Sequence, residues 1–308
     1  MLRSVLLYLS SARWARAIVM NFFLARRAAH RFVAGETVDQ AVAAAKEMNQ
    51  KGMMVSLDHL GESVKDREMA IRATDDYMEI LDAIYHHQLD ANVSVKLTQL
   101  GLDVSAELCV DNMRRILAKA SEIGTSVNID MESSDYVDAT LRIYRDLLKD
   151  FDNIGTVIQS YLRRSEADMQ TLAQEGGVIR LCKGAYKEPA TVAFPDKADV
   201  DASFIRITKE YMKPENRETG AYLKVATHDP KIINETLDYA KENNVPADAF
   251  EFQMLYGIRT QTQQDLVDQG YQVRVYIPYG TEWYPYFMRR LAERPANLWF
   301  ILKNLFTR

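Results

Sequence analysis

The stretch Tyr276-Ile-Pro-Tyr-Gly-Thr-Glu-Trp-Tyr-Pro-Tyr-Phe-Met-Arg-Arg-Leu-Ala-Glu293 begins at the end of a short alternating segment, residues 272–276. The alternation predicts a strand, Pro278 and Gly280 predict a turn, and the pattern from Trp283 onward predicts a helix. A strand that leads through a turn into a helix is the repeating unit of a parallel α/β fold.

The predicted helix carries Tyr286, Arg289, Arg290 and Glu293 at spacings of three or four residues, which place them on one face. Two adjacent guanidinium groups can bind a carboxylate or a phosphate through paired, charged hydrogen bonds. Glu293 could hold one guanidinium in place, and Tyr286 could close the side of such a pocket. Considered alone, the helix could also be a solvated Arg-Arg-Glu surface.

Seven more strand-and-helix units precede this stretch in unbroken alternation. Their strands are predicted at residues 53–58, 93–97, 126–130, 155–159, 178–182, 222–226 and 250–253. The helices are predicted at residues 37–52, 64–87, 105–123, 134–149, 165–175, 204–212, 230–243 and 260–269, with a last helix from Pro295. Eight such units favour closure into a distorted (βα)8 TIM-type barrel over an open, doubly wound sheet. We expect an N-terminal helical arm at 1–52, a barrel catalytic domain at 53–308 and an extra C-terminal helix.

Composition limits the classes of function. The chain has 308 residues, 47% hydrophobic and 26% charged, as in globular proteins with a large core. Its two cysteines argue against a disulfide framework and suit the cytoplasm. The net charge of −5 makes nucleic acid an unlikely partner, and no dinucleotide-binding, P-loop or HExxH pattern occurs. The five histidines lack metal-ligand spacing, so no metal centre is predicted.

The first 35 residues differ in charge from the rest of the chain. They carry six arginines and no acidic residue, and the arginines interrupt every apolar run before it reaches the roughly 20 residues that span a bilayer. A basic amphipathic arm of this kind can lie on an anionic membrane. It also resembles a transit peptide, and simple packing on the protein body is equally open. We therefore expect a cytoplasmic protein, with peripheral contact to the inner face of the membrane as one option.

A polar residue stands at the predicted end of each strand. These residues are Asp58, Lys96, Asp130, Gln159, Lys183, Thr227, Gln253 and Tyr276. Arg180 lies within the fifth strand, and His228 follows the sixth. Because the carboxyl ends of barrel strands meet at the mouth, these side chains predict a site for an anionic ligand. Two of them have simpler explanations, since Asp58 could cap the next helix and His228 could be a supporting group.

Lys96 allows a different chemistry. A lysine at a barrel strand end can form a Schiff base, as in barrel aldolases, so a lyase or aldolase without a redox cofactor is one alternative. A membrane-bound binding protein that depends on the basic arm is another. Glycine-rich phosphate loops, which would favour a phosphorylated ligand, are weakly represented.

Several stretches together resemble the proline dehydrogenase family of flavoenzymes. They are Ser94-Val-Lys-Leu-Thr-Gln-Leu, Asn128-Ile-Asp-Met-Glu, Val157-Ile-Gln-Ser-Tyr-Leu, Arg180-Leu-Cys-Lys-Gly-Ala-Tyr, Ala226-Thr-His, Phe250-Glu-Phe-Gln-Met-Leu-Tyr-Gly and the stretch 276–293. They follow the family's order from the second strand to the last helix. The chain resembles the small monofunctional bacterial members, without the aldehyde dehydrogenase domain of the bifunctional form. Cys182 stands where an aliphatic residue is usual.

The resemblance implies non-covalent FAD at the barrel mouth. Arg180 would lie near flavin N5, and Asp130 would be an acid at the active centre that orders Lys96 and Arg180. The remaining cofactor-binding residues that it implies are Met131, Gln159, Lys183, Gly184, Ala185, Thr227 and His228.

The resemblance also implies the substrate and the reaction. L-Proline would be oxidised to 1-pyrroline-5-carboxylate by hydride transfer from C5 to FAD, with a membrane quinone or another electron acceptor as the onward partner. Lys96, Arg289 and Arg290 would hold the proline carboxylate. Tyr276, Tyr286 and Leu255 would enclose the proline ring.

Overall fold

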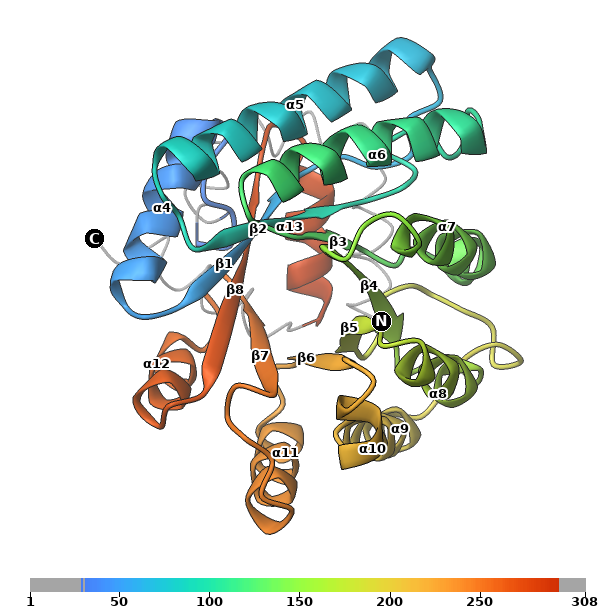
Figure 1. The fold of residues 1–308 in the computed structure, drawn as a ribbon, viewed down its shortest axis with the longest axis vertical. Helices are drawn as coiled ribbons and strands as arrows, with labels where there is room; N and C mark the ends of the chain where they lie inside the picture. Colours follow the sequence, from blue (N-terminus) through green and yellow to red (C-terminus); the bar gives the residue numbers. More distant parts are fainter. Residues whose placement is uncertain (1–28, 30, 294–308) are drawn as a thin grey trace.

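The structure, a computed structural model, describes Ala29 and residues 31–293. Eight parallel strands pair in chain order and close into a barrel, with β8 hydrogen-bonded to β1 (Figure 1). The closed barrel confirms the predicted fold class and excludes the open doubly wound sheet. The strands are β1 (Met54–His59), β2 (Ala91–Val95), β3 (Val127–Ile129), β4 (Ile154–Gln159), β5 (Val178–Cys182), β6 (Tyr222–Ala226), β7 (Phe250–Leu255) and β8 (Gln272–Tyr279).

The last two strands are longer than predicted. β7 continues to Leu255 and β8 to Tyr279, and Leu255 pairs with Tyr276 in the ladder. Gln253 and Tyr276 therefore lie within strands, where they were predicted to end them. Pro278 did not stop β8, because its backbone faces away from β1, toward the side where β7 has already ended. Its missing N–H therefore costs no ladder bond, and its carbonyl accepts from the Ala34 N–H at 2.9 Å.

Helices follow the strands, and their starts match the capping signals of the sequence. Thr37 and Gln40 form the predicted capping box of α4, and Asp229 caps α11 ahead of Pro230. The helices are α4 (Val38–Gln50), α5 (Arg67–His86), α6 (Ala106–Glu122), α7 (Val137–Leu148), α8 (Ser165–Gln174), α9 (Lys197–Tyr211), α10 (Pro214–Arg217), α11 (Pro230–Glu242), α12 (Thr260–Asp268) and α13 (Trp283–Glu293), with a 3-10 turn, η1 (Ser134–Tyr136).

Helix α9 begins about two turns before its prediction, which placed it at residues 204–212. Lys197, its first residue, donates to Asp201 one turn later and lies 3.0 Å from Asp229, which follows β6. This contact with another part of the barrel orders the first turn of α9. Local sequence could not reveal it, because Asp229 lies 32 residues away.

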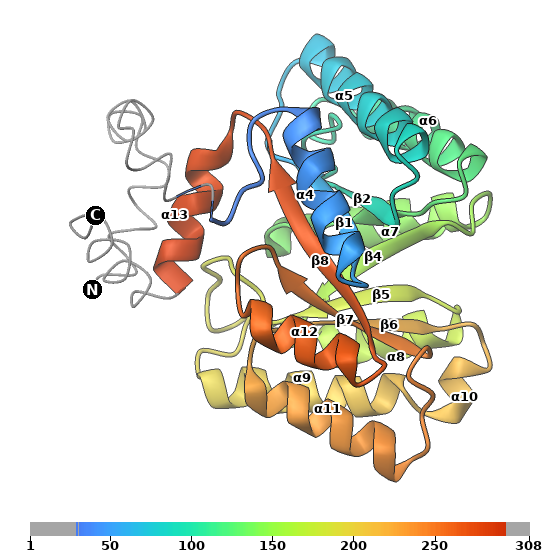
Figure 2. The same ribbon diagram turned by 90° about the vertical axis from the view of Figure 1, so that its left-hand side faces the viewer.

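Helix α13 is displaced from the ring of helices around the barrel. It lies beyond the carboxyl end of β8 and is seen through the middle of the barrel in Figure 1 and beside the barrel in Figure 2. Helix α4, from the predicted N-terminal arm, packs instead against β8 and β1. Helix α4 thus covers the outside of β8 and β1, and α13, which carries Arg289 and Arg290, lies over the barrel mouth.

The segment at residues 31–36 holds α13 in this position. The Gly280 N–H donates to the Gly35 carbonyl at 2.9 Å, and Trp283 Nε1 donates to Glu36 at 3.1 Å. Phe32, 3% exposed, packs in one apolar cluster with Phe287 on α13. Residues 31–36, which belong to the predicted arm, thus pack beside α13 at the barrel mouth.

We expect Phe32→Ala to loosen α13, since removing a buried phenylalanine costs about 3–5 kcal/mol. Amide hydrogen exchange in residues 283–291 should accelerate. Val104→Ala, which removes an exposed apolar side chain, is the control. Unchanged exchange in α13 would show that Phe32 does not hold this helix.

Among the described residues, no helix is long and apolar enough to cross a membrane. Residues 1–28 and 30, with five of the six N-terminal arginines, and the helix predicted from Pro295 lie outside the described residues.

Candidate active site

Side chains in or directly after five strands, β1, β2, β3, β5 and β8, meet at the barrel mouth in one connected network. Lys96 Nζ donates to Asp58 Oδ1 at 2.8 Å and lies 3.8 Å from Asp130 Oδ2. Asp130 also accepts from Arg180 Nη1 at 2.5 Å and from the Tyr276 hydroxyl at 2.6 Å. Asp130 therefore joins the two cations that it was expected to order.

Asp58 is a partner of Lys96 and does not cap the next helix. The cap of α5 is Asp66, which accepts from the Met69 N–H at 3.1 Å. Asp58 is 1% exposed and Lys96 12% exposed, so this ion pair is largely removed from water. Its strength therefore depends on both partners remaining charged.

The environment of Lys96 keeps its amine protonated. Burial alone lowers the pKa of Lys96, but the carboxylates of Asp58 and Asp130 outweigh it, and the pKa lies well above its ordinary value. A Schiff-base lysine has to present a neutral amine as its nucleophile. The geometry therefore suits Lys96 as a fixed positive charge and argues against the aldolase alternative.

Arg180 is held from the interior of the barrel as well as from its mouth. Its Nε donates to Gln253 Oε1, and its Nη2 donates to Ser94 Oγ at 2.9 Å. The Gln253 amide in turn donates to Glu251 at 2.5 Å. The Arg180 guanidinium also lies over the Tyr276 ring, 5.2 Å from its centre. Its plane is therefore fixed from several sides.

Gln159 has a buried polar atom suited to a ligand. Its amide nitrogen donates to the Glu132 carbonyl at 3.2 Å and lies 3.5 Å from that of Met131. Its side-chain oxygen is buried and receives no hydrogen bond from the residues that the structure describes. Because an unmet buried acceptor is costly, an N–H donor on a bound molecule would stabilise this position.

The residues predicted after β5 lie beside a charged cluster. Lys183 Nζ bonds Asp201 at 2.5 Å and Asp229 at 2.7 Å. Gly184 has φ +105° and packs so closely on the Tyr161 ring that a Cβ would overlap it. The position therefore requires glycine for both reasons. The Lys183 side chain is bound by these carboxylates.

The residues after β6 support the neighbouring strand end. The Leu255 N–H donates to His228 Nε2 at 2.9 Å, so that nitrogen is the acceptor. The Thr227 hydroxyl oxygen accepts from the Asp229 N–H at 3.1 Å. Ala185, Leu255 and His228 are each half-buried at the mouth.

Arg289 faces a cavity of about 720 Å³ between α13 and the loop that connects β1 and α5. Lys96 and Glu62 line the same cavity, and Arg289 Nη1 bonds Glu62 Oε1 at 3.1 Å. Arg290 lies over the Tyr286 ring, 5.2 Å from its centre, and neither residue lines this cavity. The structure thus brings Arg289 toward Lys96 and places Arg290 against Tyr286.

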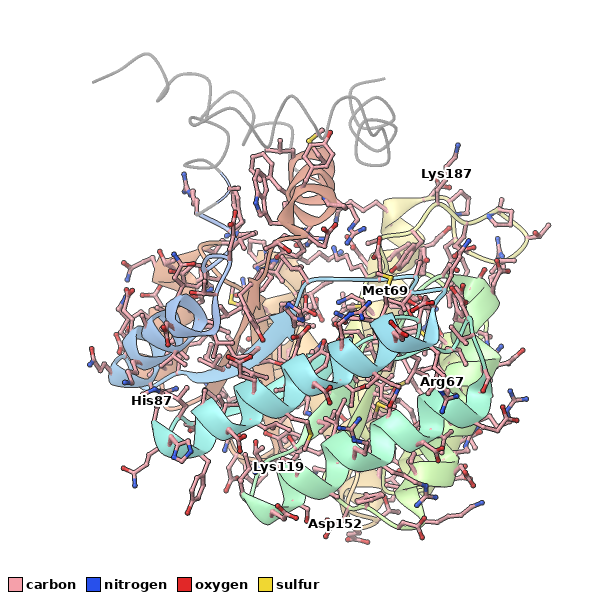
Figure 3. All side chains as sticks on the ribbon, turned by 90° about the horizontal axis from the view of Figure 1, so that it is seen from above. Arg67, Met69, His87, Lys119, Asp152 and Lys187 are labelled. Carbon is pink, nitrogen blue, oxygen red and sulfur yellow. The ribbon has the colours of Figure 1, made fainter. Side chains whose placement is uncertain are left out.

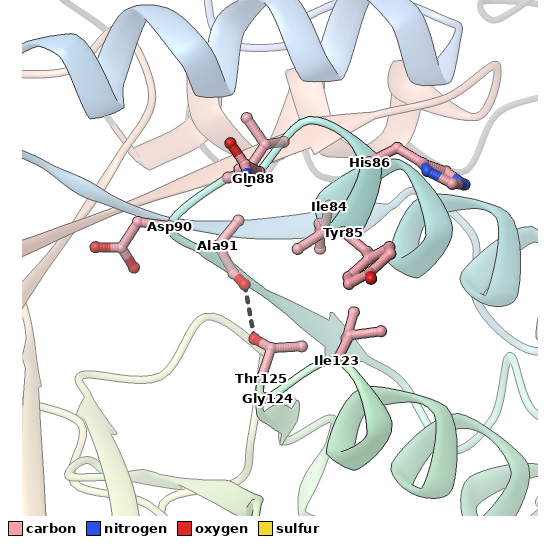
Figure 4. Close-up of a pocket in the computed structure, with 10 residues that line it drawn as sticks. Ile84, Tyr85, His86, Gln88, Asp90, Ala91, Ile123, Gly124 and Thr125 are labelled. Carbon is pink, nitrogen blue, oxygen red and sulfur yellow. Dashed lines mark hydrogen bonds between the residues drawn. The ribbon is translucent and has the colours of Figure 1, made fainter.

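A second cavity, of about 450 Å³, lies at the other end of the barrel (Figure 4). It opens between the carboxyl ends of α5 and α6, beside Tyr85 and Ile123. Its wall is fixed by Thr125, whose hydroxyl donates to the Ala91 carbonyl at 2.7 Å. None of the predicted site residues lines it.

The family model for proline dehydrogenase matches residues 41–303 of this chain. The chain belongs to the proline dehydrogenase family. This confirms the resemblance drawn from the motifs and the prediction of an enzyme. Membership of this family shows that the lyase or aldolase alternative was wrong.

Curated proline dehydrogenases are similar over nearly the full chain. Proline dehydrogenase 1 of Bacillus subtilis subsp. natto is 43% identical over 305 residues, 99% of each chain. The proline dehydrogenase of Deinococcus radiodurans is 42% identical over 282 residues, 90% of this chain and 89% of that relative.

A solved structure is similar in fold. Proline utilization A (PutA) from Bdellovibrio bacteriovorus, inactivated by N-propargylglycine, superposes with a TM-score of 0.81 at 29% identity. The match covers 91% of this chain and 34% of that one. The distorted barrel is therefore shared with a much longer protein.

Three residues of this candidate site were not anticipated. Glu62 was missed as the partner of Arg289, a role considered for Glu293, whose side chain lies outside the description. Glu132 and Gln253 were quoted within motifs but given no contact. For Glu132 and Gln253, the available signal was their place in stretches that resemble the family. The hydrogen-bond partners of both became evident only in the closed barrel.

Proposed function

We propose that the chain oxidises L-proline to 1-pyrroline-5-carboxylate with non-covalently bound FAD, the first step of proline catabolism. When bound, FAD supplies the ring nitrogen, N5, that accepts a hydride from proline C5. The observation that carries this proposal is the network of Lys96, Asp130, Arg180 and Tyr276 at the mouth of a family-typical barrel.

The residues at the mouth fit a flavin. The buried oxygen of Gln159 suits the imide N–H of the flavin ring, and Arg180 offers a fixed positive charge where negative charge develops on reduction. We assign the remaining cofactor contacts to Met131, Lys183, Gly184, Ala185, Thr227 and His228. The Lys183 amine already bonds Asp201 and Asp229, and its carbonyl accepts from the Tyr161 N–H at 2.9 Å, so we assign its backbone N–H to the cofactor.

The substrate carboxylate would bind between Lys96 and Arg289, the two cations that line one cavity. Arg290 would complete this clamp. A clamped carboxylate fixes the orientation of proline C5, which is the main requirement of hydride transfer. Tyr276, Tyr286 and Leu255 would enclose the ring.

The same cations assist deprotonation of the substrate. Proline must lose a proton from nitrogen to form the imine, and nearby positive charge lowers the pKa of its ammonium group. Asp130 would act by holding Lys96 and Arg180 in place. The Tyr276 hydroxyl would fix Asp130 Oδ2, the carboxylate oxygen that Arg180 Nη1 does not bind.

Electrons would pass to a membrane quinone or another acceptor. We further propose that the basic residues 1–35 allow peripheral contact of a cytoplasmic protein with the inner face of the membrane, and that the arm, 1–52, and the barrel, 53–308, are the two units of the chain.

Non-covalent FAD has a direct test. The purified protein should absorb as a flavoprotein, and acid precipitation should release FAD, identified chromatographically, into the supernatant. Gln159→Leu should retain less FAD, because it removes the buried acceptor, whereas Gln261→Leu on the exposed face of α12 should not. A flavin that stays with the precipitate, or equal FAD content in the Gln159 variant, would contradict the assignment.

A further inference from the structure

Thr98, in the turn after β2, uses every polar atom that it has. Its backbone N–H and its hydroxyl both donate to Glu132, at 3.2 and 2.6 Å. Its carbonyl accepts from the Val64 N–H at 3.0 Å, and its hydroxyl oxygen accepts from the Ser63 N–H at 3.0 Å. Two contacts thus face the carboxylate, and two face the loop between β1 and α5.

Residues 61–65 of this loop are attached to the barrel through Thr98. Among the described residues, the backbone N–H groups of Ser63 and Val64 both donate to Thr98, and no other hydrogen bond from a backbone N–H of residues 61–65 is present. Ser63 has φ +57°, a conformation that costs a non-glycine residue free energy and persists only where contacts enforce it. In Figure 3 the loop runs between α13 and α5 toward Met69.

Glu132 gives this attachment a rigid base. Its side chain is 6% exposed, and its carbonyl accepts from the buried Gln159 amide at 3.2 Å. It lies two residues beyond Asp130, so one short segment carries both the acid of the active-site network and the anchor of Thr98. Glu132 is thereby fixed relative to Lys96.

The position of this loop determines where Glu62 lies relative to Arg289 on α13. Glu62 immediately precedes Ser63 and bonds Arg289, and the loop lines the cavity that Lys96 and Arg289 share. A shift of Ser63 would therefore move Glu62 relative to Arg289. Within the part of the chain that the structure describes, no other backbone hydrogen bond of residues 61–65 opposes that shift, and the remaining restraint is the packing of Val64 against Ala70 and Leu108.

We propose that Thr98, anchored by Glu132, is a positioning residue that sets Glu62 against Arg289 and thereby sets the affinity of the site for carboxylate ligands. This rests on the proposed function for the identity of the ligand, proline. The positioning itself is a property of the loop and can be tested separately.

The first test compares Thr98→Val with Thr98→Ser in the full-length protein by amide hydrogen exchange. Valine keeps the branched shape but loses the hydroxyl, whereas serine keeps the hydroxyl. The valine variant loses the bond from the Ser63 N–H and the bond to Glu132, and only the first of these holds the loop directly. Exchange at Ser63 and Val64 should accelerate up to about tenfold in the valine variant, as expected for that one bond to the loop, and remain near the parent rate in the serine variant. Equal exchange in all three proteins overturns the positioning role.

The second test asks whether Thr98 acts through Glu62. The probe is L-tetrahydro-2-furoic acid, an unreactive carboxylate with the ring shape of proline. Thr98→Val should change its dissociation constant in the parent background, and this change should be largely lost in a Glu62→Gln background, because interacting residues are non-additive. Equal changes in both backgrounds overturn the proposal. A parent protein that does not bind the probe contradicts the proposed function. Hydrogen exchange then still shows whether Thr98 positions the loop.

Discussion

Lys96→Met should lower the free energy of unfolding by about 3–5 kcal/mol, because it leaves the carboxylate of Asp58 buried without its cation. Asp58 is 1% exposed and bonds Lys96 at 2.8 Å. The same substitution should sharply weaken binding of proline and of its unreactive carboxylate analogue, since it removes one charge from the proposed clamp. Denaturant unfolding and ligand titration measure the two effects.

A second substitution separates these effects. Asp58→Asn combined with Lys96→Met removes both charges, so much of the stability should return while ligand binding should not. Normal ligand affinity in the double variant would show that Lys96 acts only as the partner of Asp58. Unchanged stability in the single variant would contradict the buried ion pair.

Arg180→Lys should lower the turnover of proline by about 10²–10³-fold, the usual effect of removing one oriented donor from a transition-state site. Lysine keeps the charge but has no planar fork to reach Asp130, Gln253 and Ser94 together. FAD content should be measured in each preparation, so that turnover is expressed per bound flavin.

The matched control is Arg163→Met, because Arg163 is exposed and lies over the Phe194 ring. Its turnover should equal that of the parent. Parent-like turnover in Arg180→Lys would mean that the orientation of the guanidinium is unimportant, and Arg180 would then be a structural cation of the barrel.

Most of the fold could be predicted, because strands and helix caps depend on local patterns. The strand at residues 178–182 and that at 222–226 were predicted to the residue. The lengths of β7 and β8 were missed, since a strand end depends on where its neighbour stops. The position of α13 over the mouth was equally inaccessible, because it depends on contacts with Phe32 and Gly35 more than 240 residues away.

The site could be predicted only in part. Alternation and strand ends identified Lys96, Asp130 and Arg180, and the barrel topology places them together. The partner of Arg289 could not be found, because Glu62 lies in a loop whose path depends on Thr98. Arg289 and Arg290 were predicted to share one face, but adjacent helical residues point in different directions, and the structure gives them different neighbours, Glu62 and Tyr286.

Anaerobic mixing of the purified, FAD-loaded protein with L-proline tests the central claim most directly. The flavin absorbance should bleach with L-proline, and 1-pyrroline-5-carboxylate should form in an amount equal to the flavin reduced. D-Proline, whose carboxylate projects from the opposite face of the ring, should bleach it far more slowly. A flavin that stays oxidised with L-proline, or a colourless protein that FAD cannot reconstitute, would contradict the account.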